Sequence, residues 1–218
     1  MNKQIPIIIT GSSKGLGQEI AKKWCISSKD NEDNVYYGLS RWNDLDIAKF
    51  EEIQAYISGL AHDDNVPVAL INNAGICIPG NTIDMKIEDL QKQFNVNFFG
   101  LVNATQTYIK LCLKYRFKGK IINIASTAGL GARPGRCGYS SSKAAVINFS
   151  LSLARELKEY GIKVYTICPG AFDSEMRRKI APEDDFEKML KPDEIADFII
   201  DIINNGKFLD NQIIYTVK

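Results

Sequence analysis

The stretch "TGSSKGLG", Thr10 to Gly17, follows directly on the apolar run "IPIII" and is the best guide to how the chain folds. A buried strand that passes through a glycine-rich turn into a helix aims backbone N–H groups and the helix dipole at one point, where an anion can bind. Glycines also serve any tight connection that needs positive φ. The turn alone therefore leaves both a phosphate site and an ordinary connection open, because its spacing, Gly-x-x-x-Gly-x-Gly, differs from the common Gly-x-Gly-x-x-Gly fingerprint.

Compact apolar runs alternate with longer helical patterns along the whole chain. The sequence predicts strands in "IPIIIT", "VYYGLS", "VALIN", "KIINIA", "IKVYTI" and "QIIYTV". Continuous apolar runs of this kind are typical of strands that are covered on both faces. Helices are predicted over residues 16–28, 47–60, 87–115, 137–160 and 192–205. This order predicts an α/β fold: a single-domain Rossmann-type doubly wound parallel β-sheet over residues 1–218, with helices on both faces.

Composition limits the possible partners and sites. The 27 Lys and Arg residues nearly balance the 26 Asp and Glu residues, so no overall field draws the chain to nucleic acid or to a membrane. The first apolar run is too short for a signal peptide or a membrane span, and we expect a cytoplasmic protein. Five cysteines lie far apart and the chain has one histidine, His62, expected at the surface. We therefore expect reduced thiols and no metal site.

The segment "YSSSK" places Tyr139 and Lys143 four residues apart on a predicted helix, so their side chains share a face. A tyrosine with an ordinary pKa of about 10 is a poor base near neutrality, and a nearby ammonium group lowers that pKa by stabilising the anion. A Tyr and a Lys also occur four residues apart by accident in many helices. The pair alone leaves catalysis and coincidence open.

Six motifs in a fixed order resemble those of the short-chain dehydrogenase/reductase family, and the resemblance runs from Ile5 to about Lys218. In chain order the motifs are "TGSSKGLG", "NNAG", "NVNFFG", "INIAS", "YSSSK" and "CPGAFDSEM". They match the family's cofactor turn, central-strand motif, helix asparagine, catalytic serine, tyrosine–lysine pair and Pro-Gly segment. Ser126 lies 13 residues before Tyr139, which is the family's separation.

The resemblance implies hydride transfer between a nicotinamide and a carbonyl or alcohol. Tyr139 would exchange a proton with the substrate oxygen, Lys143 would lower the tyrosine pKa and hold the nicotinamide ribose, and Ser126 would hydrogen-bond the substrate oxygen. Asn97 would position a water that relays protons. Ser126 as a strand-end cap and Asn97 as a local backbone partner remain alternatives. The implied cofactor-binding residues are Gly11, Ser12, Ser13, Lys14, Gly15, Leu16, Gly17, Ser40, Arg41, Asp44, Leu45, Asn73, Ala74, Gly75, Tyr139, Lys143, Pro169, Gly170 and Ser174.

The charges after the second predicted strand bear on the choice of cofactor. An acid at this place holds the 2′-hydroxyl of NAD, whereas the 2′-phosphate of NADP needs positive charge. The stretch "VYYGLSRWN" offers Ser40 and Arg41 with no acid before Asp44, and Lys14 lies in the glycine turn. We expect NADP(H), with NAD(H) as the alternative if Lys14 and Arg41 are solvated surface cations.

Two segments differ from the family's pattern. The stretch between Arg41 and Asn72 is short, so we expect a missing helix, with or without a missing strand. The sequence stops at "QIIYTVK", without the tail that many members carry, which weighs against a homotetramer. Because the helices that contain Asn97 and Tyr139 commonly form a dimer interface in the family, we expect at least a homodimer.

Substrate identity is open. Ile76, Cys77, the loop "TAGLGARPGRCG" and residues 171–191 are expected to face a small-molecule carbonyl or alcohol substrate. Arg133 and Arg136 in that loop are either anion-recognising or ordinary surface residues. The leading function is an NADP(H)-dependent carbonyl reductase. The alternatives are a non-catalytic dinucleotide-binding sensor or scaffold and, least favoured because no substantial C-terminal substrate domain is available, a nucleotide-sugar epimerase or dehydratase.

Overall fold

A parallel sheet forms the centre of the computed structural model, which describes residues 5–27, 34–40, 45–60, 66–205 and 213–216. Its strand order is β2-β1-β3-β4-β5-β6. The strands are β1 (Ile5–Thr10), β2 (Asn34–Leu39), β3 (Ala69–Asn72), β4 (Lys120–Ile124), β5 (Lys163–Pro169) and β6 (Ile213–Thr216). Every neighbouring pair in this order is parallel, which confirms the predicted α/β sheet.

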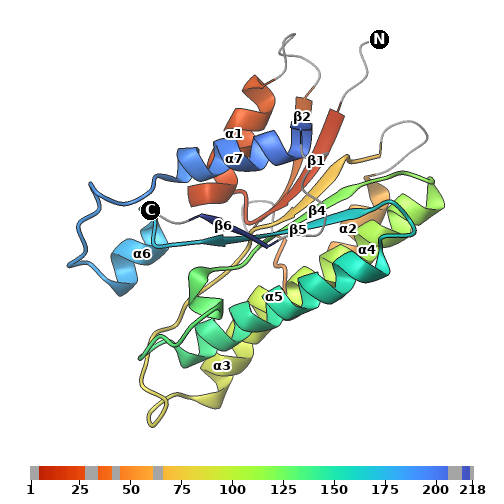
Figure 1. Cartoon of the computed structure of the whole chain (residues 1–218). Helices are drawn as coiled ribbons and strands as arrows, with labels where there is room; N and C mark the ends of the chain where they lie inside the picture. The colour runs from red at the N-terminus through yellow and green to blue at the C-terminus, as the bar shows by residue number, and fades with distance from the viewer. Residues whose placement is uncertain (1–4, 28–33, 41–44, 61–65, 206–212, 217–218) are drawn as a thin grey trace.

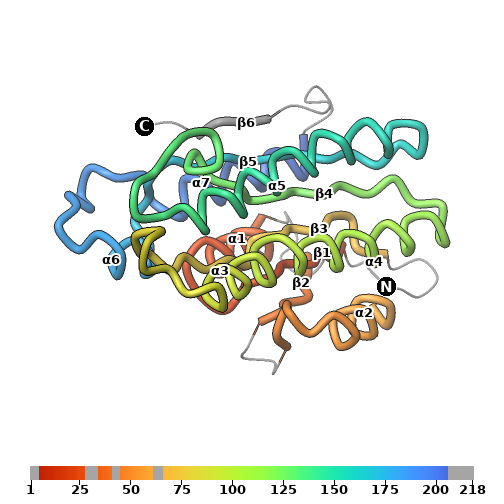
Figure 2. Tube along the Cα trace, turned by 90° about the horizontal axis from the view of Figure 1, so that it is seen from below, coloured from red at the N-terminus to blue at the C-terminus, as the bar shows by residue number. Residues whose placement is uncertain are grey.

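Helices cover both faces of the sheet because strands β1, β3, β4 and β5 send apolar side chains to both sides. Ile7 and Ile9 of β1 pack in one core, and Ile8 packs in the other. Helices α1 (Gly15–Ile26) and α7 (Pro192–Asn205) lie on the first face, as Figure 1 shows. The second face carries α2 (Phe50–Gly59), α3 (Ile87–Phe94), α4 (Gly100–Lys114) and α5 (Cys137–Glu156), which lie nearest the viewer in Figure 2.

The helix boundaries differ from the sequence prediction in several places. The helix predicted over 87–115 consists of α3 and α4 joined by a π-helical turn at Asn95–Phe99, and it ends at Lys114. The helix predicted over 47–60 begins only at Phe50, although Ile47 is buried. The helix predicted over 137–160 ends at Glu156. A short helix, α6 (Glu175–Ile180), follows β5 and was not predicted.

The shortened segment between β2 and β3 places β2 at the edge of the sheet. Its described residues contain helix α2 and no strand. The chain therefore reaches β3, on the other side of β1, by a single crossover. Among the described residues, no helix is both long enough and apolar enough to cross a bilayer.

The strand order changes direction at β1, and this creates a crevice. Thr10 at the end of β1 pairs in register with Leu39 of β2 and with Asn72 of β3. The carboxyl ends of these strands therefore lie level, while the connections that follow β1 and β3 leave on opposite faces. In open α/β sheets ligands bind at such a switch point.

Gly17 is required because α1 packs directly on the turn after β1. A Cβ at this position would lie 2.2 Å from the Gly11 carbonyl oxygen and 2.5 Å from Asn73 Nδ2. Gly17→Ala should therefore lower the free energy of unfolding by about 1–3 kcal/mol, the usual cost of overpacking. Urea denaturation measures this change.

The matched control is Gly59→Ala, at the end of α2, where an added Cβ meets nothing within 4 Å. Its free energy of unfolding should stay the same or rise by up to about 1 kcal/mol, since alanine favours helix. Equal denaturation midpoints for the two variants would show that the close packing at Gly17 is not a constraint.

Candidate active site

A cavity of about 790 Å³ opens at the carboxyl ends of β1, β3, β4 and β5. That volume is in the range of sites for cofactors and other small molecules. Most of the residues predicted from the sequence line this one cavity. They are Gly11, Ser13, Lys14, Gly15, Leu16, Ser40, Leu45, Asn73, Ala74, Gly75, Ser126, Tyr139, Lys143, Pro169, Gly170 and Ser174.

The glycine turn has the properties of an anion cradle. Gly11 and Gly15 have φ values of 69° and 56°, in the left-handed region that favours glycine. A Cβ on Gly15 would meet no atom within 4 Å, so the turn is open on that side. Helix α1 begins at Gly15 with no side-chain cap and no acid in its first turn. Its first N–H groups are therefore available to a pyrophosphate, which the turn fits chemically.

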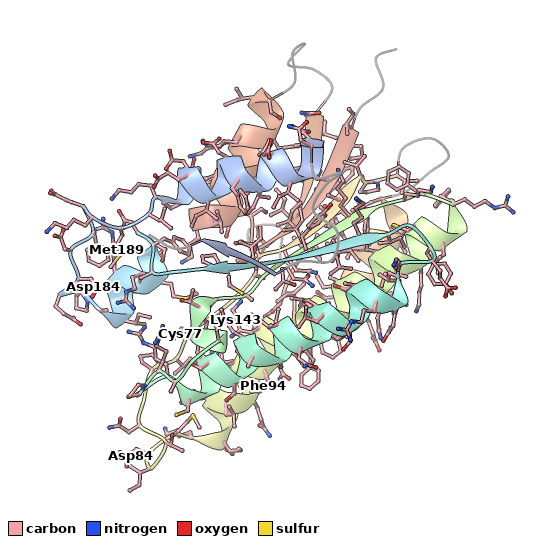
Figure 3. All side chains as sticks on the ribbon, in the orientation of Figure 1. Cys77, Asp84, Phe94, Lys143, Asp184 and Met189 are labelled. Atoms are coloured by element: carbon pink, nitrogen blue, oxygen red, sulfur yellow. The ribbon has the colours of Figure 1, made fainter. Side chains whose placement is uncertain are left out.

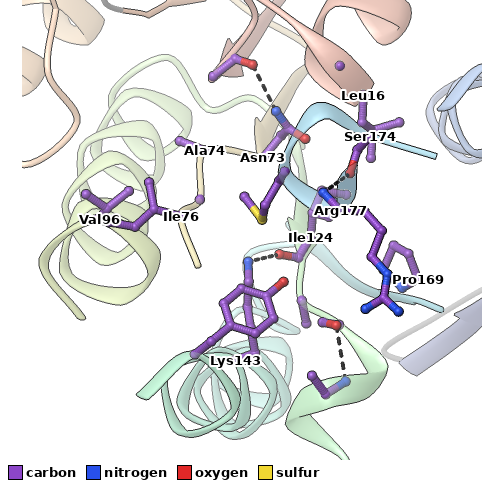
Figure 4. A pocket seen from close by; sticks show the side chains of 18 of the residues that line it. Leu16, Asn73, Ala74, Ile76, Val96, Ile124, Lys143, Pro169, Ser174 and Arg177 are labelled. Atoms are coloured by element: carbon purple, nitrogen blue, oxygen red, sulfur yellow. Dashed lines mark hydrogen bonds between the residues drawn. The ribbon is translucent and has the colours of Figure 1, made fainter. Parts of the chain in front are cut away.

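Asn73 fastens the glycine turn to the end of β3. Its Nδ2 donates to the carbonyl oxygens of Thr10 and Gly11, at 3.1 and 3.0 Å. In return, Thr10 Oγ1 accepts from the backbone N–H groups of Asn73 and Ala74, both at 3.0 Å. Figure 4 shows Asn73 and Lys143 on opposite sides of the cavity. These four bonds fix the cavity wall that the cofactor would contact.

Several predicted residues do not line the cavity. Ser12 is buried beneath Gly38, and Gly17 packs against Gly11. Arg41, Asp44 and His62 lie outside the described residues. The described residues after β2 that line the cavity are Ser40, Leu45, Asp46 and Ile47, so the acid described in this segment is Asp46, two residues beyond the predicted Asp44.

Ser126 and Tyr139 meet at the other end of the cavity. Ser126 follows β4 and caps a 3₁₀ turn, Thr127–Gly129, because its Oγ accepts from the Ala128 N–H at 3.1 Å. The capping alternative is therefore real, and the same hydroxyl also hydrogen-bonds Tyr139. Burial raises the pKa of Tyr139 to about 12, while the Ser126 hydrogen bond lowers it in part. The phenol is thus protonated at neutral pH.

Lys143 lies between α5 and the sheet and is 4% exposed. Its Nζ donates to the Ile124 carbonyl oxygen at 2.8 Å and lies 5.9 Å from the centre of the Tyr139 ring (Figure 4). Burial lowers the pKa of Lys143 to about 8. That Lys143 lowers the tyrosine pKa stays a prediction, because burial dominates the pKa of Tyr139 here and the lysine Nζ bonds a backbone carbonyl.

Asn97 sits in the π-helical turn and is 1% exposed. Its Oδ1 accepts from the Ile76 N–H at 2.8 Å, and its Nδ2 donates to the Ile76 carbonyl and to Ser142 Oγ, both at 2.9 Å. Ser142 Oγ donates in turn to the Tyr139 carbonyl at 2.7 Å. Asn97 therefore links the segment after β3 to the helix that carries Tyr139. The predicted proton-relay water stays a prediction.

Residues 171–191, hereafter the lid, follow β5, and part of this segment, between Ala171 and Ile180, lines the cavity. Arg177 forms an ion pair with Asp184, and Asp173 accepts from Arg178 at 2.7 and 2.9 Å. Figure 3 shows Asp184 and Met189 in the lid, with Lys143 on the inner side of α5. Lys14 reaches the lid from the glycine turn, where its Nζ lies 2.7 Å from Glu175 Oε2. Lys14 and Lys179 together hold the pKa of Glu175 at about 2.

Comparison with known proteins decides the family. A family model described as "short chain dehydrogenase" matches residues 41–185. Oxidoreductase UcpA of Salmonella typhimurium is 31% identical over 201 residues, which cover 84% of this chain and 76% of UcpA. The chain belongs to the short-chain dehydrogenase/reductase family. The 3-oxoacyl-[acyl-carrier-protein] reductase FabG of Thermotoga maritima is 28% identical, with 95% of this chain and 94% of FabG covered.

Solved structures share the fold of this chain. 4-Hydroxyisoleucine dehydrogenase complexed with NADH superposes with a TM-score of 0.81 at 24% identity, covering 98% of this chain and 96% of that one. ElxO with NADP bound superposes with a TM-score of 0.80 at 25% identity, covering 99% and 97%. The chain is an oxidoreductase of this family.

Sequence reasoning missed three residues that support the site through hydrogen bonds to its backbone. Thr10 and Ser142 lie inside the motifs "TGSSKGLG" and "YSSSK" but were given no role. The fully buried Gln93, whose Oε1 accepts from the Ile78 N–H at 3.0 Å, lies in no motif. The Asp46–Ile47 pair had a signal, since it follows the predicted Asp44–Leu45 pair directly and has the same acid–apolar order.

The buried lysine should make stability depend on pH. Between about pH 8 and 10.5 the unfolded chain holds the Lys143 proton and the folded chain does not, so stability rises with pH across this window. At about 1.36 kcal/mol per unit, this gain is roughly 3 kcal/mol. Lys143→Met lacks the titrating group and should lose the gain.

Urea unfolding of both proteins across this pH range tests the prediction, because the other titrating groups largely cancel in the difference between them. The unfolding free energy of Lys143→Met minus that of wild type should be largest near neutral pH and should fall as the pH rises through this window. A difference in unfolding free energy that stays flat with pH would contradict a desolvated Lys143.

Proposed function

We propose that the chain is an NADP(H)-dependent carbonyl reductase with Tyr139 as its proton donor. The observation that carries this proposal is the meeting of Ser126, Tyr139 and Lys143 with the glycine turn in one cavity. A sensor would need only the cofactor half of this arrangement. That the protein acts in the cytoplasm as a homodimer or homotetramer stays a prediction.

The side chains supply positioning and proton transfer. The Gly11–Gly15 turn and the start of α1 would hold the pyrophosphate, and Lys143 would hold the nicotinamide ribose. The bound nicotinamide supplies the hydride. Ser126 Oγ would donate to the carbonyl oxygen as negative charge develops there, and Tyr139 would transfer its proton to that oxygen. Because burial keeps the pKa of Tyr139 near 12, the protonated form needed for reduction predominates at neutral pH.

Removing the proton donor tests the chemistry. Tyr139→Phe keeps the ring but lacks the hydroxyl, so turnover of a carbonyl substrate should fall by about 10²–10⁴-fold, the usual contribution of a general acid. Binding of NADPH, followed by nicotinamide fluorescence, should change little. The control is Tyr160→Phe, an exposed tyrosine just after α5. Equal turnover in the two variants would rule out Tyr139 as the acid.

The preference for NADPH rests on Lys14, which lines the cavity beside the glycine turn, and on Arg41, which is supported by sequence alone. Lys14 forms an ion pair with Glu175 in the lid. Glu175 also forms an ion pair with Lys179, so the carboxylate keeps a partner when Lys14 turns to a phosphate. The cavity acid after β2, Asp46, is engaged locally, because its Oδ1 accepts from the Ala48 N–H at 3.0 Å.

Cofactor titrations test this preference at fixed near-physiological salt. Wild type should bind NADPH more tightly than NADH, and Lys14→Gln should weaken NADPH about tenfold or more while leaving NADH little changed. Glu175→Gln should tighten NADPH by freeing Lys14. Lys22→Gln is the control, because Lys22 lies in α1, the helix that Lys14 precedes, and is paired with Glu19. Tighter binding of NADH by wild type would contradict the preference and leave the oxidoreductase assignment intact.

A further inference from the structure

The charges that line the cavity are unbalanced. Among the described lining residues, two are acidic, Asp46 and Glu175. Five are basic: Lys14, Arg133, Arg136, Lys143 and Arg177. Glu175 is already paired with Lys14, and Asp46 lies in the segment that follows β2. The three arginines belong to the catalytic end, since Arg133 and Arg136 come from the loop before Tyr139 and Arg177 comes from the lid helix α6.

Arg136 is the arginine with the strongest claim to a ligand. It is half-buried and stands immediately before α5, three residues from Tyr139. No residue in the described part of the chain offers its guanidinium a hydrogen bond or a carboxylate. Its charge acts on the interior of the site, because Arg136 lowers in part the burial-raised pKa values of both Tyr139 and Cys77.

The other two arginines surround the same space. Arg177 holds Asp184, yet its charge also acts on the Cys77 thiol from the lid side. Figure 4 shows the Arg177 side chain extending from α6 beside Pro169. Arg133 donates to the neighbouring Ala132 carbonyl at 3.2 Å and is exposed at the rim. In the described part of the chain, the three guanidinium groups thus have two acceptors: the Asp184 carboxylate for Arg177 and the Ala132 carbonyl for Arg133.

An arginine in a partly desolvated site is stabilised by a planar anion, because its fork of N–H groups matches a carboxylate in a bidentate arrangement. The lining residues Ile76, Met176 and Ile180 provide an apolar surface in the same cavity. A ligand that satisfies both features has an apolar chain with a carboxylate at one end.

On the basis of the proposed function, we propose that the substrate is a keto acid: a carbonyl compound whose separate carboxylate binds Arg136, with Arg177 and Arg133 adding positive charge. In the reduction, hydride from NADPH adds to the carbonyl carbon and the Tyr139 proton adds to the oxygen. The products are a hydroxy acid and NADP⁺, and the carboxylate is unchanged. The arginines therefore set specificity and take no part in the chemical step.

Pairs of probes that differ only in charge test this inference. The probes are 4-oxopentanoate, 5-oxohexanoate and 6-oxoheptanoate, each measured beside its neutral methyl ester, with NADPH consumption as the readout. Wild type should favour at least one acid over its ester by about tenfold or more in kcat/KM. Arg136→Gln should remove that preference, mainly by raising KM for the acid, and Arg136→Lys should restore part of it.

Arg155→Gln is the matched control, since it removes the same charge from an exposed position near the end of α5. Thermal unfolding of each variant checks that Arg136→Gln is folded. Calorimetric binding of glutarate to the protein with NADPH gives a second readout that needs no turnover. Tighter glutarate binding by wild type than by Arg136→Gln, without turnover of any probe, would overturn the proposed function and support the anion site. An acid-to-ester ratio near one, or glutarate binding that is absent or independent of Arg136, would overturn the inference.

Discussion

The exchange of hydrogen bonds between Asn73 and Thr10 is the constraint on which the site depends. Four bonds tie the end of β1 to the segment after β3, where the sheet changes direction. The close approach of α1 adds a second requirement, since Gly17 leaves no space for a side chain. Together they hold the glycine turn open toward the cavity while its polar groups on the buried side are satisfied. The shape of the proposed phosphate site is thus a consequence of how β1, β3 and α1 pack.

The catalytic end is built on burial of titratable groups. Lys143 is almost fully buried and bonds the Ile124 carbonyl, and burial lowers its pKa, while burial raises that of Tyr139. Both shifts favour the neutral forms, but a Lys143 pKa of about 8 still leaves most of its ammonium groups charged at pH 7, whereas the Tyr139 phenol is neutral there. Arg136 adds further positive charge and lowers the burial-raised pKa of Tyr139 in part. A neutral phenol beside positive charge suits the proposed roles, in which Tyr139 would donate a proton and Arg136 would recognise an anion.

The sequence predicted the sheet, its six strands and most cavity-lining residues, because strands covered on both faces are compact apolar runs and the motifs lie at their carboxyl ends. It did not predict the π-helical turn around Asn97 or the bonds of the Asn97 side chain to Ile76 and Ser142, which are distant in sequence. The pairing of Lys14 with Glu175 joins residues 161 positions apart and was likewise invisible. Local patterns identify residues that chemistry requires, whereas tertiary partners decide which of them are already engaged.

The most direct test of the account is a crystal structure of the protein with NADP⁺ bound. The account predicts that the pyrophosphate lies against the backbone N–H groups of the Gly11–Gly15 turn and the start of α1. It also predicts that the nicotinamide ribose lies within hydrogen-bonding distance of Tyr139 and Lys143, with the ring beside Ser126. A dinucleotide bound elsewhere, or one whose nicotinamide points away from Tyr139, would contradict it.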